Sequence, residues 1–148
     1  MTSYVDNPAA TAEILSADGW LRTGDICYVS DGKWYVVDRA KELIKVRGWQ
    51  VAPAELEGVL VTHPKIVDAA VVGVKRGDTE APRAFVLRAP GVKPEDITEE
   101  DVRRFMGERL AKFKALDGGI VFVDAIPKNM TGKTVKKKLT EMYPYTDA

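Results

Sequence analysis

The stretch DRAKELIKVRG, residues 38–48, decides how this chain is divided. It lies between two pairs of short β-rich runs. The first pair, 26–30 and 33–37, flanks Asp31-Gly32, a dipeptide typical of the type I′ turn of a β-hairpin. The second pair, 43–46 and 49–51, flanks Arg47-Gly48 and predicts a smaller hairpin. The polar residues between the two hairpins therefore predict a domain boundary.

After this boundary, helical and strand patterns alternate. Pro53 suits the first turn of a helix, and Thr98 begins a capping box that opens another. Strands are predicted at 66–74, 83–88 and 119–124. Three helix faces are expected to point inward: Leu56, Val59, Leu60 and His63; Val102, Phe105, Met106 and Leu110; Val135, Leu139 and Met142. The fold class is α+β, a small sheet flanked by helices.

Residues 1–37 are too few for an ordinary domain. They contain a helical stretch near 9–15 and the first hairpin, and two strands alone are only marginally stable in water. Two interpretations stay open on periodicity alone. The segment is either a subdomain packed on the rest of the chain or the last strands of a larger domain that precedes it.

Composition excludes several classes of function. Twenty-two basic residues balance 22 acidic ones, which argues against a nucleic-acid binder. Cys27 is the one cysteine and His63 the one histidine, so a disulfide framework or a Cys/His metal site is excluded. Cys27 is expected in the core. Without a run of roughly 20 apolar residues, a signal-peptide pattern or a C-terminal Ser-Lys-Leu, we expect a cytoplasmic protein without membrane contact.

Three segments could carry chemistry. Asp25 follows a glycine at a strand start, and its two oxygens match the paired hydroxyls of a ribose; the alternative is a turn residue. Arg39 could form fork-like bonds to ribose or phosphate, and Arg47 with Gly48 could receive a second phosphate-bearing ligand. The alternative for these charges is a solvated hairpin whose charges compensate one another.

The third segment is PKNMTGKT, residues 127–134. Gly-Lys-Thr suggests a P-loop, but the first glycine of that motif would fall at Pro127, so the motif is rejected. What remains is Lys133 on a glycine-containing loop before a helix, where an ammonium can stabilise developing negative charge. The lysines at 136–138 are expected on a solvated helix face, and His63 is expected to be structural.

The order of several motifs resembles the adenylate-forming superfamily, most closely its 4-coumarate–CoA ligase and luciferase branch. The motifs are GWLRTGD at 19–25, VDRAKELIK at 37–45, GWQVAPAELE at 48–57, and IPKN at 126–129 with Gly132-Lys133. The similarity covers almost the whole chain. It implies a C-terminal piece of an ATP-dependent carboxylic acid–CoA ligase: residues 1–37 from the large N-terminal domain, a hinge at 38–41, and a mobile lid domain at 42–148.

The resemblance also implies roles for individual residues. Lys133 would be catalytic, bridging the substrate carboxylate and the α-phosphate of ATP. Asp25 and Arg39 would bind the nucleotide. At the hinge and beyond it, Lys41 and Lys45 would face the adenylate, and Arg47 with Gly48 would line the CoA side. ATP, Mg²⁺ and CoA would serve the complete enzyme, with Mg²⁺ bound outside this chain.

Two departures from the family pattern leave these charges in place. Ala40 stands where the hinge usually has leucine, and Asn-Met-Thr-Gly-Lys at 129–133 replaces Asn-Pro-Ser-Gly-Lys. The expected partner is the rest of the same enzyme, and the chain alone should be nearly inactive. Two alternatives remain: a non-catalytic module that docks an acidic partner through 128–138, or the end of a peptide-synthetase or luciferase-type adenylation enzyme.

Overall fold

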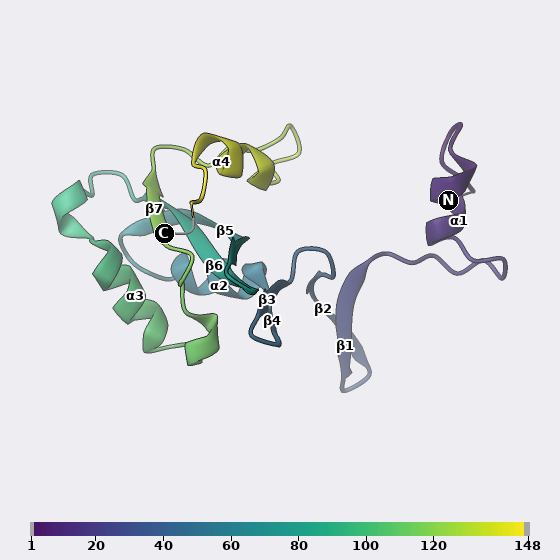
Figure 1. The fold of residues 1–148 in the computed structure, drawn as a ribbon, viewed down its shortest axis with the longest axis horizontal. Coiled ribbons are helices and arrows are strands. Elements are labelled where there is room, and N and C mark those ends of the chain that lie inside the picture. The colour runs from purple at the N-terminus through teal and green to yellow at the C-terminus, as the bar shows by residue number, and fades with distance from the viewer. Residues whose placement is uncertain (1, 147–148) are drawn as a thin grey trace. The chain divides into compact units, whose positions relative to one another are not determined.

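The computed structural model describes residues 2–146, which form two compact units (Figure 1). The N-terminal unit is Met1–Lys41 and the C-terminal unit is Glu42–Ala148, so the division falls within the polar stretch 38–48.

The N-terminal unit consists of one short helix and one hairpin. Helix α1, Pro8–Ile14, is capped by Asn7, whose side chain accepts a hydrogen bond from the Ala10 N–H at 3.0 Å. Strands β1 (Asp25–Ser30) and β2 (Lys33–Arg39) pair antiparallel. Their turn has φ values of 50° at Asp31 and 72° at Gly32, as the predicted type I′ turn requires.

Within residues 2–41 no side chain is buried. The prediction that Cys27 lies in a core is therefore wrong, because its side chain is exposed. The reason is architectural: within this unit, no second layer covers either face of the two-stranded ribbon. Its alternation of apolar side chains was read correctly as a strand, but that alternation does not say what covers the strand.

The C-terminal unit begins with the second hairpin, β3 (Ile44–Val46) and β4 (Trp49–Val51). A three-stranded sheet follows, with strands β5 (Ile66–Arg76), β6 (Thr79–Arg88) and β7 (Ile120–Val123) in that spatial order. Strands β5 and β6 form a long antiparallel hairpin, whereas β7 runs parallel to β6. Strand β6 begins at Thr79, four residues before the predicted start at Arg83, so this strand is longer than predicted.

Helices α2 (Pro53–Leu60), α3 (Glu99–Gly107) and α4 (Lys136–Met142) flank the sheet, with single 3₁₀ turns at Pro94–Asp96 and Lys112–Lys114. Thr98 caps α3 as predicted. Helix α3 ends before Leu110, which nevertheless packs against the core from the following segment. Over residues 2–146 no helix combines the length and apolar character needed to cross a membrane.

One predicted inward residue points out. Met142 is 62% exposed, whereas Leu139 of the same helix is fully buried. Because α4 ends at Met142, the chain turns there and Tyr143 takes the packed position, with its ring 5.9 Å from that of Phe85.

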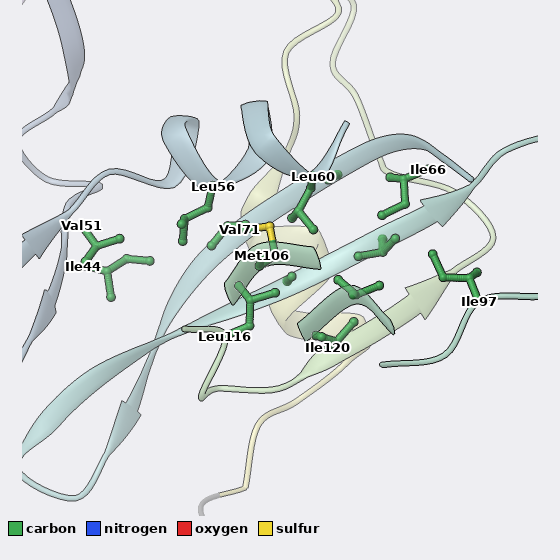
Figure 2. Packing of buried hydrophobic residues seen from close by; sticks show 14 of the residues in the cluster. Ile44, Val51, Leu56, Leu60, Ile66, Val71, Ile97, Met106, Leu116 and Ile120 are labelled. Atoms are coloured by element: carbon green, nitrogen blue, oxygen red, sulfur yellow. The ribbon is translucent and has the colours of Figure 1, made fainter. Parts of the chain in front are cut away.

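Both faces of the sheet are covered. Figure 2 shows the cluster beneath α2 and α3, in which Leu56 and Leu60 meet Val71 of β5 and Met106 of α3. On the opposite face, Leu139 of α4 packs in a second cluster with Val72, Phe85 and Val123, among others. Strand β5 therefore reads as a nearly continuous apolar run. The result is the predicted small α+β domain.

Candidate functional site

Asp25 and Arg39 are brought together in the N-terminal unit. They are register partners across β1 and β2, and Arg39 Nε lies 3.3 Å from Asp25 Oδ1. The Asp25 side chain is only 26% exposed, while that of Arg39 is 65% exposed. The Asp25 N–H donates to Thr23 Oγ1 at 3.2 Å, which fixes the backbone at the start of the strand. The two predicted nucleotide-binding residues therefore form one polar site.

This pair suits a sugar hydroxyl and a phosphate. The pairing with Arg39 uses part of the acceptor capacity of the Asp25 carboxylate and leaves lone pairs for donors such as ribose hydroxyls. Arg39 keeps further N–H groups of its guanidinium for an anion. Gly24, with φ of 77°, supplies a left-handed backbone immediately before the carboxylate, a conformation that L side chains rarely adopt.

Lys45, Arg47 and Gly48 lie together on the β3–β4 hairpin, which is tied to the start of β6. The Arg47 N–H donates to Thr79 Oγ1 at 2.7 Å, and that hydroxyl donates to the Lys45 carbonyl at 2.9 Å. The Lys45 N–H donates to Glu80 Oε2 at 2.7 Å. These bonds hold the turn, in which both Arg47 and Gly48 have positive φ, against the sheet.

The same hairpin borders an open hollow of about 510 Å³, lined by Lys45, Arg47, Gly48, Lys75, Asp78, Thr79 and Glu80. Three cationic side chains stand here with two carboxylates. Such a surface can receive a phosphate-bearing ligand while the carboxylates limit non-specific binding of anions. Sequence reasoning missed residues 75 and 78–80. Strand β6 begins at Thr79, earlier than predicted, and its first residues, Thr79 and Glu80, lie beside the β3–β4 hairpin. A prediction of the longer strand would have indicated them.

Lys133 lies on a loop organised by Asn129. The Asn129 Oδ1 atom accepts three hydrogen bonds: from the Thr131 N–H at 3.0 Å, the Thr131 hydroxyl at 2.8 Å and the Lys133 N–H at 2.9 Å. The Asn129 N–H donates to the Lys133 carbonyl at 2.9 Å, and Gly132 turns the chain with φ of 81°. The loop therefore has a defined backbone although its residues are exposed.

The Lys133 ammonium is free to meet a ligand. Its side chain is exposed, and in residues 2–146 no carboxylate lies within 4.0 Å of it. An ammonium held on an ordered loop without a protein counter-ion can neutralise a substrate carboxylate or phosphate. Lys133 does not line the hollow beside Arg47. Lys41 is exposed at the end of the N-terminal unit.

One of the three lysines of α4, Lys136, differs from the prediction. Lys137, 86% exposed, lies on a solvated face as expected, and Lys138 is also exposed. Lys136 does not, because its side chain is only 25% exposed and forms ion pairs with Glu57 and Glu42. Helical spacing alone could not reveal these partners, which come from segments about 80 and 94 residues away.

His63 has a structural environment. Its ring meets Phe105 edge-on with centroids 4.7 Å apart, and its Nδ1 accepts the Lys65 N–H at 3.2 Å. Burial lowers the pKa of the imidazole from its ordinary value, and the nearby Lys65 ammonium lowers it further. The neutral ring fits the predicted packing role.

Comparison with known proteins identifies the class to which this fold and lysine loop belong. The family described as "AMP-binding enzyme C-terminal domain" matches residues 55–133, more than half of the chain, and the chain belongs to this family. The sequence-based resemblance to adenylate-forming CoA ligases is thereby confirmed.

Relatives sharpen this assignment. The chain is 51% identical to a phenylacetyl-CoA ligase, epaB, of Aspergillus niger, over 93% of this chain and 26% of that protein. It is 47% identical to a probable 4-coumarate–CoA ligase of Dictyostelium discoideum, over 97% of this chain and 26% of that protein. Among solved structures, ATP-bound MatB of Rhodopseudomonas palustris matches with a TM-score of 0.83 and 33% identity, over 95% of this chain and 28% of that one. The chain thus spans about a quarter of the length of the curated relatives it matches.

Proposed function

We propose that this chain is the C-terminal, lysine-bearing part of an AMP-forming carboxylic acid–CoA ligase. The observation that carries the proposal is the ordered loop of Lys133, whose exposed ammonium forms no ion pair with residues 2–146, inside a domain of this family. Its similarity to acyl-CoA and 4-coumarate–CoA ligases supports a CoA thiol as the acceptor.

The proposed reaction has two steps. In the first, a substrate carboxylate attacks the α-phosphorus of ATP, forming acyl-AMP and releasing pyrophosphate. In the second, the CoA thiol attacks the acyl carbonyl and AMP leaves. Lys133 acts in the first step, because two anionic groups must approach each other and an ammonium between them lowers their repulsion.

Asp25 and Arg39 are proposed to hold the nucleotide. Asp25 accepts hydrogen bonds from the ribose hydroxyls, and Arg39 contacts ribose or phosphate oxygens. Their 3.3 Å ion pair supports this assignment, because it holds the carboxylate in one orientation before the nucleotide arrives.

Residues 38–41, the last four of the N-terminal unit, are proposed as the hinge between the two steps. Lys41 and Lys45 would contact the adenylate in one state or the other, while Arg47 and Gly48 would line the path of CoA. The cationic hollow beside the β3–β4 hairpin supports the CoA assignment, because CoA carries several phosphate charges.

ATP, CoA and Mg²⁺ are the small molecules that this reaction implies, and the expected protein partner is a large N-terminal domain. In the part of the chain that the structure describes, no three His, Cys, Asp or Glu side chains gather as ligands for a metal ion.

The decisive test grafts this chain in place of the matching C-terminal quarter of the phenylacetyl-CoA ligase epaB. We expect the graft to catalyse phenylacetate-dependent exchange of pyrophosphate into ATP and to form phenylacetyl-CoA. Lys133→Ala should lower the exchange rate about 10²- to 10³-fold, as loss of one preorganised charge typically does. Lys137→Ala is the control and should keep the rate of the graft.

Two results would overturn the proposal. One is an active graft in which Lys133→Ala exchanges pyrophosphate as fast as the unsubstituted graft. The other is rapid exchange by the 148-residue chain alone, because the proposed N-terminal domain, which would supply the remaining contacts to ATP and the acid, is absent from that assay.

A further inference from the structure

The loop that carries Lys133 is closed at its base by the backbone. Lys128 and Thr134 form an antiparallel bridge, and the Val135 N–H donates to the Pro127 carbonyl at 2.8 Å. Lys133 therefore lies at the base of a small closed loop, directly before the bridging residue Thr134 and with its carbonyl bonded to the Asn129 N–H. Its position relative to the domain depends on what fixes that base.

Ion pairs fix the base on both sides. On the entering side, Lys128 Nζ lies 2.7 Å from Asp68 Oδ2 of strand β5. On the leaving side, Lys136 Nζ lies 3.0 Å from Glu57 Oε1 of helix α2 and 3.2 Å from Glu42 Oε2. Lys136 is the first residue of α4, three positions after Lys133.

Glu57 is itself held by the sheet. Its Oε1 accepts the N–H of Val71 at 2.8 Å, and Val71 belongs to β5, one of the two edge strands of the three-stranded sheet. The side chains of Lys136 and Glu57 are only 25% and 24% exposed, so this pair is less screened by water than an ordinary surface salt bridge. The same carboxylate oxygen thus joins helix, strand and lysine loop.

Glu42, the second partner of Lys136, lies where the chain enters the C-terminal unit. It is the first residue of that unit and directly follows Lys41. Through Lys136, the base of the lysine loop is held against this entry segment and against α2 at the same time.

We propose that Lys136, held by Glu57 and Glu42, is the positioning residue for Lys133. This inference rests on the proposed function, in which Lys133 acts in adenylation. Lys136 does not touch substrate. It fixes the exit of the loop, so that the Lys133 ammonium reaches the same point in every turnover, and displacement by about 1 Å of such a group can cost about 10²-fold in rate.

The first test uses the 148-residue chain itself. Lys136→Met keeps a long side chain but removes the charge that binds Glu57 and Glu42. We expect the backbone amides of Gly132 and Lys133 to exchange with deuterium about tenfold faster than in the unsubstituted chain. Lys137→Met is the matched control, because that neighbouring ammonium is exposed and 3.8 Å from Glu141; it should leave both rates unchanged. Equal rates in the two variants would overturn the proposal.

The second test uses the epaB graft and separates the two half-reactions. Lys136→Met should slow pyrophosphate exchange about 10- to 100-fold, while conversion of preformed phenylacetyl-AMP to phenylacetyl-CoA keeps its rate. Lys136→Arg, which retains the cation, should recover most of the exchange rate. Equal slowing of both half-reactions would mean that Lys136 only stabilises the domain, and would overturn the positioning role.

Glu57→Gln is a second variant that breaks the same ion pair, in case Lys136→Met fails to fold. Glutamine keeps an oxygen for the Val71 N–H but loses the charge that pairs with Lys136, so we expect the same selective loss of exchange. A normal exchange rate in Lys136→Met and Glu57→Gln, with Lys133→Ala slow, overturns this inference alone. A normal rate in Lys133→Ala instead overturns the proposed function on which it rests.

Discussion

The N-terminal and C-terminal units differ in how they hold their polar site residues. In the C-terminal unit, buried side chains from Ile44 to Leu139 fill both faces of a sheet, and the Lys133 loop is fastened to that packed frame. In residues 2–41, Asp25 and Arg39 are positioned by strand pairing and local polar contacts without a buried side chain beneath them, while Trp20 and Trp34 are 74% and 76% exposed.

The difference shows that the local geometry of a hairpin does not by itself stabilise the site residues that the hairpin carries. The β1–β2 hairpin has a tight turn, antiparallel pairing with one shift in register between Ile26 and Cys27, and Tyr28 stacked on Tyr35 with ring centroids 5.0 Å apart. Yet two strands without a covering layer bury too little apolar surface to be more than marginally stable. The C-terminal unit has the covering helices, so its loops are attached to a rigid body.

Hydrogen exchange should reveal the largest contrast between the units. Amides in the centre of β6, the middle strand of the sheet, such as that of Phe85, should be protected on the order of 10³-fold or more, because they open only when the unit unfolds. Amides in β1 and β2 should be protected about tenfold or less. NMR-detected exchange of the 148-residue chain measures both, and equal protection would contradict the comparison.

Truncating a matched pair of apolar residues should give the next largest effect. Leu60→Ala removes a fully buried side chain from the cluster beneath α2, and should lower the free energy of unfolding of the C-terminal unit by about 2–5 kcal/mol. Trp34→Ala removes a larger but mostly exposed side chain. It should change the free energy of unfolding of the C-terminal unit by less than about 0.5 kcal/mol. Urea unfolding followed by circular dichroism measures both; a larger loss in Trp34→Ala would refute the contrast.

Two glycines of the C-terminal unit, one crowded and one open, test how closely this unit is packed. A Cβ on Gly118 would lie 2.6 Å from Val74 Cγ2 and 2.9 Å from the Pro82 carbonyl oxygen, so Gly118→Ala should destabilise by about 1–3 kcal/mol. Gly58 lies within helix α2 with nothing within 4 Å of an added Cβ, so Gly58→Ala should stabilise by about 0.5–1 kcal/mol. Thermal unfolding of the two variants gives the comparison, and the same sign for both would show that close approach is not the cause.

The smallest effect concerns the cap of α3. The side-chain hydrogen bond from Thr98, with its backbone bond and Arg104, lowers the pKa of Asp101 from 3.8 to about 2. Because the folded-state pKa is the lower one, the carboxylate favours the fold above pH 3.8, and this contribution is lost as the pH falls toward 2. Thr98→Ala should raise the pKa of Asp101 toward 3.8, as an NMR titration of its carboxyl carbon would show. An unchanged pKa would exclude Thr98 as the main cause.

Local features of the fold could be predicted from the sequence because they depend on a few neighbouring residues. Asp31-Gly32 and Arg47-Gly48 adopt the positive φ that their turns need. Thr98 caps α3, and Pro53 begins α2. The loop of Lys133 was also found from its own composition, although its role stays a prediction.

Tertiary structure decided what lies far apart in the sequence. Strand β7 pairs in parallel with β6 although α3 lies between them in the sequence. Lys136, expected on a solvated helix face, is instead only 25% exposed and forms ion pairs with Glu57 and Glu42. Cys27 turned out exposed because a strand pattern carries no information about its covering layer. Backbone conformation in turns and caps depends on a few adjacent residues, so the sequence alone determines it. Ion pairs and burial depend on which distant surfaces the packed sheet brings together, so only the tertiary structure decides them.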